Sequence, residues 1–248
     1  MVKISGTQFR VRTAAVVVIG DELLDGRQDT NGPAVEAALT AWGWEARARL
    51  VLPDDCALVS DGVAALLQKH DAVITCGGLG PTQDDVTRQA CAAALKVPLA
   101  FHPPAWRAIQ ARFRRFNRPC TENNRIQAMA PRGADVLANP NGTAPGLWMA
   151  DRGRFVLLLP GPPREMQPML DVVIRDLLTG PAGARLIHRR VLRIAGRNES
   201  QVESIAEFLR STEETLRLAA RVSGRRCRPD PEKHEEVICL AVLSGISL

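Results

Sequence analysis

The stretch TCGGLGPTQDDVT, residues 75–87, places three glycines and two adjacent carboxylates directly after an apolar run. Glycine lets a backbone approach a ligand closely, and a glycine-rich turn before a helix is a common phosphate site. Because carboxylates repel phosphate, the pair Asp84 and Asp85 predicts a metal ion or a reacting group beside the turn. The turn has neither the GxGxxG pattern of a Rossmann site nor the GxxxxGK[ST] pattern of a P-loop.

The glycine turn has two interpretations. The amides of Gly77, Gly78 and Gly80 could form an anion-binding nest at the positive end of the following helix. Thr82 and Asp85, however, have the spacing of a capping box, and glycines after a buried strand also permit a tight turn. Spacing alone leaves both interpretations open.

Carboxylates also follow two other apolar runs. Oxygen ligands of this kind suit a hard divalent cation that bridges to phosphate. Any single one is better explained as the cap of the next helix, but several in one crevice are harder to explain that way. The six residues are Asp21, Glu22, Asp54, Asp55, Asp84 and Asp85.

Two later segments are candidate ligand contacts. NPNGTAPG, residues 139–146, could close over a ligand or be an ordinary loop. Asn123, Asn124 and Arg125 open a predicted short helix and could present an amide and a guanidinium to an anion, although surface capping explains them as well. The arginines at 107, 112, 114, 115 and 118 indicate a solvated helix face, and the four separated histidines suggest no catalytic triad.

The elements that position these residues alternate between apolar, β-rich runs and segments with helical periodicity. This alternation predicts a mostly parallel sheet covered by helices on both faces, with ligands beyond the carboxyl ends of the strands. The predicted strands are 14–19, 46–52, 72–76, 135–138 and 155–159, and the predicted helices are 32–42, 58–69, 86–95, 104–116, 123–129 and 164–178.

The small-residue stretch 179–184 predicts a linker between two domains, residues 1–180 and 184–248. In the second domain the pattern favours a strand over 188–195, a helix over 199–209, a loop over 221–234 and a strand over 237–243.

Composition narrows the class of protein. A chain of 248 residues that is 46% hydrophobic can bury a real core. Its six cysteines are scattered without a CxxC pair, which favours reduced thiols and a cytoplasmic protein. The apolar run 13–19 is too short for a membrane span. The net charge of +5 divides into 20 basic against 18 acidic residues before position 183 and 12 against 9 after it, so charge alone does not suggest a nucleic acid partner.

Five ordered motifs resemble the amino-terminal domain of the CinA (competence/damage-inducible protein A) family, in the molybdopterin-binding superfamily of MoaB and MogA. They are IGDELLDGRQDTN, PDD, ITCGGLGPTQDDVT, NPNGTAPG and LLPGPPREM, within about residues 13–180. The resemblance implies a three-layer α/β/α domain with a mostly parallel sheet. HRRVLRIAGRNESQVES further resembles the small α+β KH-like domain that follows in CinA proteins, although the GXXG clamp for RNA is missing and the resemblance fades after about Thr212.

The resemblance also implies a function. CinA-type domains are associated with metal-dependent hydrolysis of ADP-ribose to AMP and ribose 5-phosphate, so the first hypothesis is a nucleotide pyrophosphatase. The glycine amides would hold the diphosphate, Asp54, Asp84 and Asp85 would hold a Mg, Mn or Co ion, and Glu22 or a water on the metal would assist attack. The expected ligand-binding residues are Asn31, Gly77, Gly78, Leu79, Gly80, Thr82, Asn124, Asn141, Gly142, Thr143, Pro160 and Gly161.

Two other hypotheses stay open. The MogA-like branch adenylylates molybdopterin, with aspartates at the positions that match Asp54 and Asp85, so the ligand could be a pterin. The chain could also be a non-catalytic nucleotide-binding module without the carboxy-terminal deamidase domain of full-length CinA proteins. The resemblance implies a homo-oligomer, dimer or trimer, with a small-molecule nucleotide or pterin as partner. The short apolar run predicts no membrane partner, and the balanced charge and missing GXXG clamp disfavour a nucleic acid.

Overall fold

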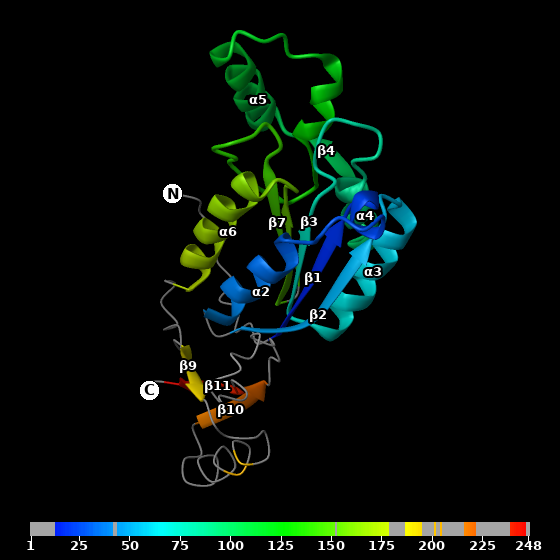
Figure 1. Ribbon diagram of the computed structural model, residues 1–248. Coiled ribbons are helices and arrows are strands. Elements are labelled where there is room, and N and C mark those ends of the chain that lie inside the picture. Colours follow the sequence, from blue (N-terminus) through cyan, green and yellow to red (C-terminus); the bar gives the residue numbers. More distant parts are fainter. Residues whose placement is uncertain are drawn as a thin grey trace. The chain divides into compact units, whose positions relative to one another are not determined.

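A six-stranded sheet organises the larger part of the chain (Figure 1). The computed structural model describes residues 13–41, 44–151, 153–178, 187–194, 201, 204, 216–221 and 239–246. The strand order is β2-β1-β3-β8-β7-β6; the first four strands are parallel to one another, and β7 pairs antiparallel with both β8 and β6. The strands are β1 (Thr13–Ile19), β2 (Glu45–Leu52), β3 (Ala72–Cys76), β6 (Asp135–Leu137), β7 (Gly146–Asp151) and β8 (Arg154–Leu159).

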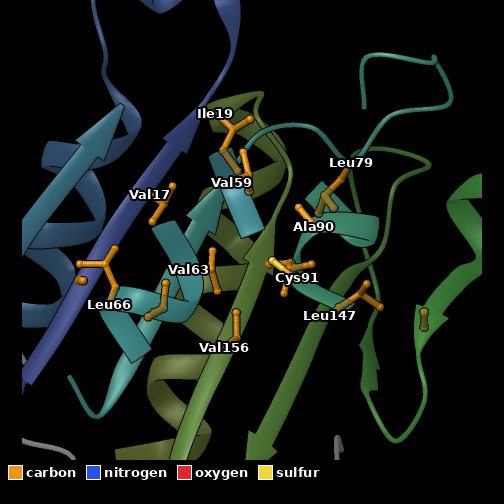
Figure 2. Packing of buried hydrophobic residues seen from close by; sticks show 14 of the residues in the cluster. Val17, Ile19, Val59, Val63, Leu66, Leu79, Ala90, Cys91, Leu147 and Val156 are labelled. Atoms are coloured by element: carbon orange, nitrogen blue, oxygen red, sulfur yellow. The ribbon is translucent and has the colours of Figure 1, made fainter. Parts of the chain in front are cut away.

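Helices cover both faces of this sheet. The helices are α1 (Asp21–Leu24), α2 (Asn31–Ala41), α3 (Cys56–Lys69), α4 (Thr87–Ala94) and α6 (Pro163–Leu178). On one face, Val17 and Ile19 of β1 pack with Val63 of α3 and Cys91 of α4 (Figure 2). In Figure 1, α2 and α6 lie over the opposite face. None of the helices in the described part of the chain is long and apolar enough to span a membrane.

The sequence of β1, TAAVVVI, explains its central position, because a strand buried on both faces needs a continuous apolar run rather than an alternating one. Each residue from Ala14 to Ile19 is buried. On the α2 and α6 face, the ring of Phe155 stacks on Trp148 at 3.9 Å and meets the edge of Trp44 at 5.5 Å. Aromatic contacts of this kind fill a large volume between the sheet and its covering helices.

A small lobe interrupts the main fold between α4 and β6. It runs from β4 (Leu99–Phe101) through α5 (Pro103–Arg115) and the 3-10 helix η1 (Glu122–Ala128) to β5 (Met129–Pro131), and β4 pairs with β5 in an antiparallel hairpin. The lobe has its own core, in which Ala105, Ile109 and Ala128 are buried under partly buried aromatic residues. In Figure 1, the lobe stands at the end of the domain toward which β1 and β3 point.

The chain divides into two compact units, residues 1–40 with 44–183, and residues 41–43 with 184–248. The second unit contains a three-stranded antiparallel sheet in the order β10-β11-β9. Its strands are β9 (Ile187–Ile194), β10 (Leu216–Arg221) and β11 (Cys239–Ile246). The predicted linker 179–184 lies outside the described residues, as do most of the predicted helix 199–209 and loop 221–234, so the KH-like assignment stays a prediction.

The predicted three-layer α/β fold with a mostly parallel sheet is confirmed. The sequence predicted the four parallel strands within one residue of their observed ends. It missed β7, since Pro145 and Gly146 at its start read as the end of a loop, and it also missed β4, β5 and β10.

Candidate functional site

The ends of β1, β2, β3 and β8 meet at one edge of the sheet. The Gly77 amide, after β3, donates to the Leu159 carbonyl at the end of β8 at 3.0 Å. Asn31, at the start of α2, donates from Nδ2 to the Gly161 carbonyl at 2.7 Å, across 130 positions of the chain. Four of the five sequence motifs therefore lie side by side, as expected for strands that end at the same edge of a sheet.

Glycine is required at two positions of the turn after β3. Gly77 has φ +108°, and a Cβ there would lie 2.2 Å from the Ile19 carbonyl oxygen. Gly78 has φ +64°, and a Cβ there would lie 2.1 Å from Thr87 Oγ1. Since only glycine tolerates both the backbone angles and the close approach, the turn packs β3 tightly against the end of β1.

The backbone amides of the turn differ in whether they are free to donate a hydrogen bond to a ligand. The Gly77 amide is bonded to Leu159, and the Gly80 amide donates to Asp85 Oδ1 at 2.6 Å. Within the described residues, the Gly78 amide has no acceptor. Leu79 buries its side chain in the core, so only its backbone could meet a ligand. The predicted diphosphate cradle thus depends mainly on Gly78 rather than on three free amides.

Asp85 holds the turn together. Its Oδ2 accepts from the Thr82 amide at 2.9 Å and from Thr82 Oγ1 at 2.5 Å, in addition to the Gly80 amide on Oδ1. A carboxylate that accepts three hydrogen bonds from one loop stabilises the conformation of that loop. Asp85 is therefore a structural residue of the turn, but the capping box was wrong, because α4 begins only at Thr87 and its N-cap, Val86, makes no side-chain hydrogen bond. Neighbouring Asp84 remains exposed.

Arg88 is fully buried beneath the same turn. Its guanidinium donates to the Leu79 carbonyl and to the Gly80 carbonyl, the latter at 3.3 Å. Burial lowers the pKa of Arg88 to about 10, while the charge of Asp85 acts in the opposite direction, so the side chain is cationic at neutral pH. A buried arginine destabilises a fold unless its charge and donors are satisfied. The two carbonyls accept from its terminal nitrogens and the charge of Asp85 favours the cation, while its Nε is buried without a hydrogen-bond partner.

Asp54, at the end of β2, is bonded to Asp21 at the end of β1 and feels the charges of nearby Glu22 and Asp84. Asp54 Oδ2 accepts from the Asp21 amide at 3.1 Å, and Asp21 Oδ1 accepts from the Asp54 amide at 3.0 Å. Partial burial raises the pKa of Asp54, and the charges of Asp21, Glu22 and Asp84 raise it further, against a lowering by the Asp21 amide. A cation beside Asp54 would stabilise its ionised form.

The described residues contain no complete metal site made of protein side chains alone. Across the described residues, no three His, Cys, Asp or Glu side chains are gathered in an arrangement that could hold a metal ion. The oxygen donors of Asp54 and Asp84 nevertheless suit Mg²⁺, which usually binds through one or two carboxylates, waters and substrate phosphates rather than a complete protein cage. Asp55 has a different role, because its Oδ1 caps α3 by accepting from the Ala57 and Leu58 amides at 2.8 and 2.9 Å.

The NPNG loop is tied to the start of α6. Asn139 Oδ1 accepts from the amides of Asn141 and Gly142, and its Nδ2 donates to Glu165 Oε2 at 2.8 Å. Asn141 donates from Nδ2 to the Arg164 carbonyl at 2.6 Å. A Cβ on Gly142 would lie 1.7 Å from Glu165 Oε2, so any larger residue there would displace the Glu165 carboxylate from its bond with Asn139. The loop is thus ordered by its own asparagines next to the β8 end.

The other predicted site residues are more dispersed. Pro160 is buried beside Gly161 at the end of β8, and Thr143 lies half-buried in the NPNG loop. Asn124 is buried in the lobe, where its Nδ2 donates to Thr121 Oγ1 at 2.8 Å and to the Thr121 carbonyl. These bonds explain Asn124 as a local structural residue of η1, and within the described residues its side chain bonds only to Thr121, away from the strand ends.

Comparison with known proteins identifies the family. A family model described as a probable molybdopterin binding domain matches residues 15–180. A crystal structure of the protein CinA with unknown function from Thermoplasma acidophilum superimposes with a TM-score of 0.63 at 32% identity, covering 67% of this chain and 99% of that one. The chain belongs to the CinA family.

Longer relatives agree with this membership. Competence-damage inducible proteins from Acetivibrio thermocellus and Moorella thermoacetica are 34% and 38% identical over 241 and 229 residues. These matches cover 92% and 86% of this chain but 57% and 55% of the relatives. This CinA-family chain therefore spans little more than half the length of the curated relatives it matches.

In this CinA-family domain, sequence reasoning missed three residues that shape the site, Arg88, Asn139 and Glu165. Arg88 begins a helix with an otherwise small and apolar sequence, TRQACAAA, and nothing in that pattern distinguishes a buried arginine from an exposed one. Asn139 could have been found from Asn-Pro-Asn-Gly, since asparagine commonly bonds to backbone amides two or three positions ahead.

Proposed function

We propose that this CinA-family domain is a metal-dependent nucleotide pyrophosphatase that hydrolyses ADP-ribose or a related dinucleotide. The observation that supports it best is the carboxylate group at Asp21, Glu22, Asp54 and Asp84, which adjoins the glycine turn at the strand ends. A diphosphate brings negative charge that these carboxylates would repel, so a divalent cation is needed between the two. The same edge of the sheet supplies an amide donor at Gly78.

Each residue at this edge of the sheet would have its own role in the reaction. Asp54 and Asp84 would hold the cation, which would polarise the phosphoryl oxygens of the bound diphosphate. The Gly78 amide would orient one phosphate, while Asp85 and Arg88 keep the turn in place. Glu22, which is exposed, would accept a proton from the attacking water. Water adds to one phosphorus, the bridging P–O bond breaks, and AMP and ribose 5-phosphate leave.

Assay of the purified protein with ADP-ribose tests this function. The reaction is followed by chromatography of AMP with EDTA, Mg²⁺, Mn²⁺ or Co²⁺. We expect AMP and ribose 5-phosphate in equal amounts with at least one cation and no product with EDTA. Absence of AMP with every cation would refute the hydrolase proposal.

Matched variants connect any activity to the site. Asp54→Asn and Asp84→Asn each remove one negative charge from the carboxylate group, and we expect losses in kcat/KM of about 100-fold or more. Asp61→Asn makes the same change on an exposed position of α3 and should keep the wild-type rate. Equal rates in all three variants would place the chemistry elsewhere.

The family match supports a second candidate, a pterin-binding protein of the molybdopterin type with or without adenylyl transfer. Both candidates need an anionic ligand at the same strand ends. Copurification of a fluorescent pterin, or restored cofactor synthesis in a deficient strain, would favour this candidate. Failure of the protein to bind pterin would eliminate it.

A third candidate is a nucleotide-binding module without turnover. It would bind ADP-ribose in calorimetry without forming AMP, and an Asp85→Asn variant that binds equally well would support it. Association into dimers or trimers is a separate proposal that sedimentation analysis can test.

A further inference from the structure

Positive charge is concentrated in the lobe of residues 99–131, called here the basic lobe. It contains six arginines and one glutamate, so its net charge of +5 equals that of the entire chain. The rest of the chain has 26 basic and 26 acidic residues and is neutral by the same count. The modest average charge of the chain therefore conceals a strongly basic element.

Most of this charge faces solvent without a partner. Arg107, Arg114, Arg115 and Arg118 are exposed, and none of them forms an ion pair with another described residue. Arg125 has one ion pair, at 3.5 Å with the exposed Glu122, and such surface pairs contribute little to stability. Its guanidinium also lies over the Phe101 ring, 4.6 Å from the ring centroid. The guanidinium groups are thus available to an anionic partner.

The fold of the lobe does not require this charge. Its core consists of apolar and aromatic side chains, mainly Ala105, Ile109 and Ala128 with Phe101, Trp106 and Phe113. The helix dipole favours cations in the last turn of α5, which accounts for Arg112, Arg114 and Arg115. Arg125 lies in the last turn of η1 and contacts Phe101. Neither a helix end nor a packing contact accounts for Arg107 and Arg118, and like charges so close together oppose the compact state.

An exposed aromatic ring lies among these arginines. Phe116, at the end of α5, is 56% exposed, one of few large apolar side chains so exposed in the described residues. The Arg112 guanidinium lies 5.4 Å from its ring centroid, and Arg112 Nη1 donates to the Pro140 carbonyl at 2.8 Å. Arg112 is thereby held by groups of the protein, while more than half of the Phe116 surface is open to another planar group.

We propose that the basic lobe binds single-stranded nucleic acid. Exposed guanidinium groups would contact the phosphates, and Phe116 would stack against a base, the combination that single strands require. An acidic peptide would use the arginines but has no planar groups for the ring. A duplex would use the phosphate contacts but keeps its bases stacked inside. This inference is independent of the proposed hydrolysis, because it uses none of the carboxylates at the strand ends.

Fluorescence anisotropy with a labelled oligodeoxythymidine of about 20 nucleotides tests the proposal on the full chain. We expect binding at about 25 mM salt that weakens roughly 100-fold by about 200 mM, as for three or four phosphate contacts to a single strand. A duplex of equal length should bind less tightly. No binding at low salt, tighter binding of the duplex, or preferential binding of polyglutamate or anionic vesicles would overturn the proposal.

Charge-matched variants locate the surface. Arg107→Glu with Arg114→Glu should weaken binding at least 10-fold, whereas Arg47→Glu with Lys69→Glu, exposed positions on β2 and α3, makes the same change in net charge and should leave it within about threefold. Phe116→Ala should weaken binding several-fold with an unchanged salt slope, because stacking releases no counterions. Thermal unfolding confirms that each variant is folded. Equal loss in both charge variants would refute the assignment to the lobe.

Discussion

Adjacent aspartates have different partners in this protein, although their side chains are chemically identical. Asp55 caps α3, whereas Asp54 is bonded to Asp21, and burial together with the charges of nearby carboxylates raises its pKa. Asp85 accepts three hydrogen bonds from its own turn, whereas Asp84 is exposed. At both places one member of the pair stabilises the fold and the other is available for chemistry, and the proposed cation is assigned to the available member.

Removal of one carboxylate should alter the response of the protein to divalent cations. Burial and like charges raise the pKa of Asp54, so its ionised form is disfavoured in the folded state. The ionised Asp54 side chain therefore lowers the free energy of unfolding at pH values above that raised pKa. Asp54→Asn should therefore have a Tm equal to or higher than that of wild type at neutral pH. Millimolar Mn²⁺ or Mg²⁺ should raise the Tm of wild type and of Asp61→Asn but not that of Asp54→Asn. A similar increase in Asp54→Asn would contradict the assignment of Asp54 as a ligand.

Replacement of the turn-holding carboxylate should instead destabilise the protein. In Asp85→Asn one acceptor oxygen becomes an NH₂ group, which cannot accept from Gly80 or Thr82, and Arg88 loses its charge partner. We expect the free energy of unfolding in urea to fall by about 1–3 kcal/mol. Asp61→Asn should stay within about 0.5 kcal/mol of wild type. A fully stable Asp85→Asn would show that the turn does not need this carboxylate.

At the scale of elements, the close approach of β1 and β3 depends on the lack of a side chain at Gly77. Gly77→Ala adds a Cβ 2.2 Å from the Ile19 carbonyl oxygen at φ +108°, and we expect about 3 kcal/mol or more of destabilisation. Gly133→Ala is the matched control, because φ is +89° there but nothing lies within 4 Å of the added atom. The control should lose only about 1–2 kcal/mol, the cost of the backbone angle. Equal losses in chemical denaturation would mean that the contact with Ile19 is unimportant.

The elements that sequence predicted best are those with continuous apolar runs. β1, β3 and β8 are buried on both faces, and their ends placed the glycine turn and two carboxylate pairs at one edge. β7 was missed because its glycine and preceding proline look like a turn, although both neighbouring strands pair with it. Hydrogen-bond partners could not be predicted at all, since they depend on side-chain directions that periodicity does not encode, and Arg88 is the clearest example.

At the scale of the whole molecule, two buried thiols make the stability of the main core depend on pH. Cys76 and Cys91 are completely buried, and burial raises the pKa of each to about 12 from the usual 9.0. In the unfolded chain these thiols ionise near pH 9, whereas in the folded protein they ionise only near pH 12. Stability is therefore unaffected below about pH 9 and falls as the pH rises toward 12, because ionisation favours the unfolded chain. We therefore expect the free energy of unfolding to decline above about pH 9, and less steeply in Cys91→Ser.

Thiol labelling checks the same feature independently. At pH 8, Cys56 and Cys120, which are partly exposed, should react with iodoacetamide in the native protein. Cys76 and Cys91 should react only in denaturant, as shown by peptide mapping. Labelling of Cys76 in the native protein at the rate of Cys56 would contradict the buried core.

The aromatic contacts on the α2 and α6 face also provide intrinsic fluorescence probes of folding. The sequence has four tryptophans and no tyrosine, so its intrinsic emission is that of indole alone. Trp44 and Trp148 both contact Phe155 in the main sheet, whereas Trp106 lies in the basic lobe. Single Trp→Phe substitutions would therefore separate the emission of the sheet from that of the lobe. Unfolding of the main sheet, which carries the proposed catalytic site, and unfolding of the basic lobe could then be followed separately by fluorescence, without any added dye.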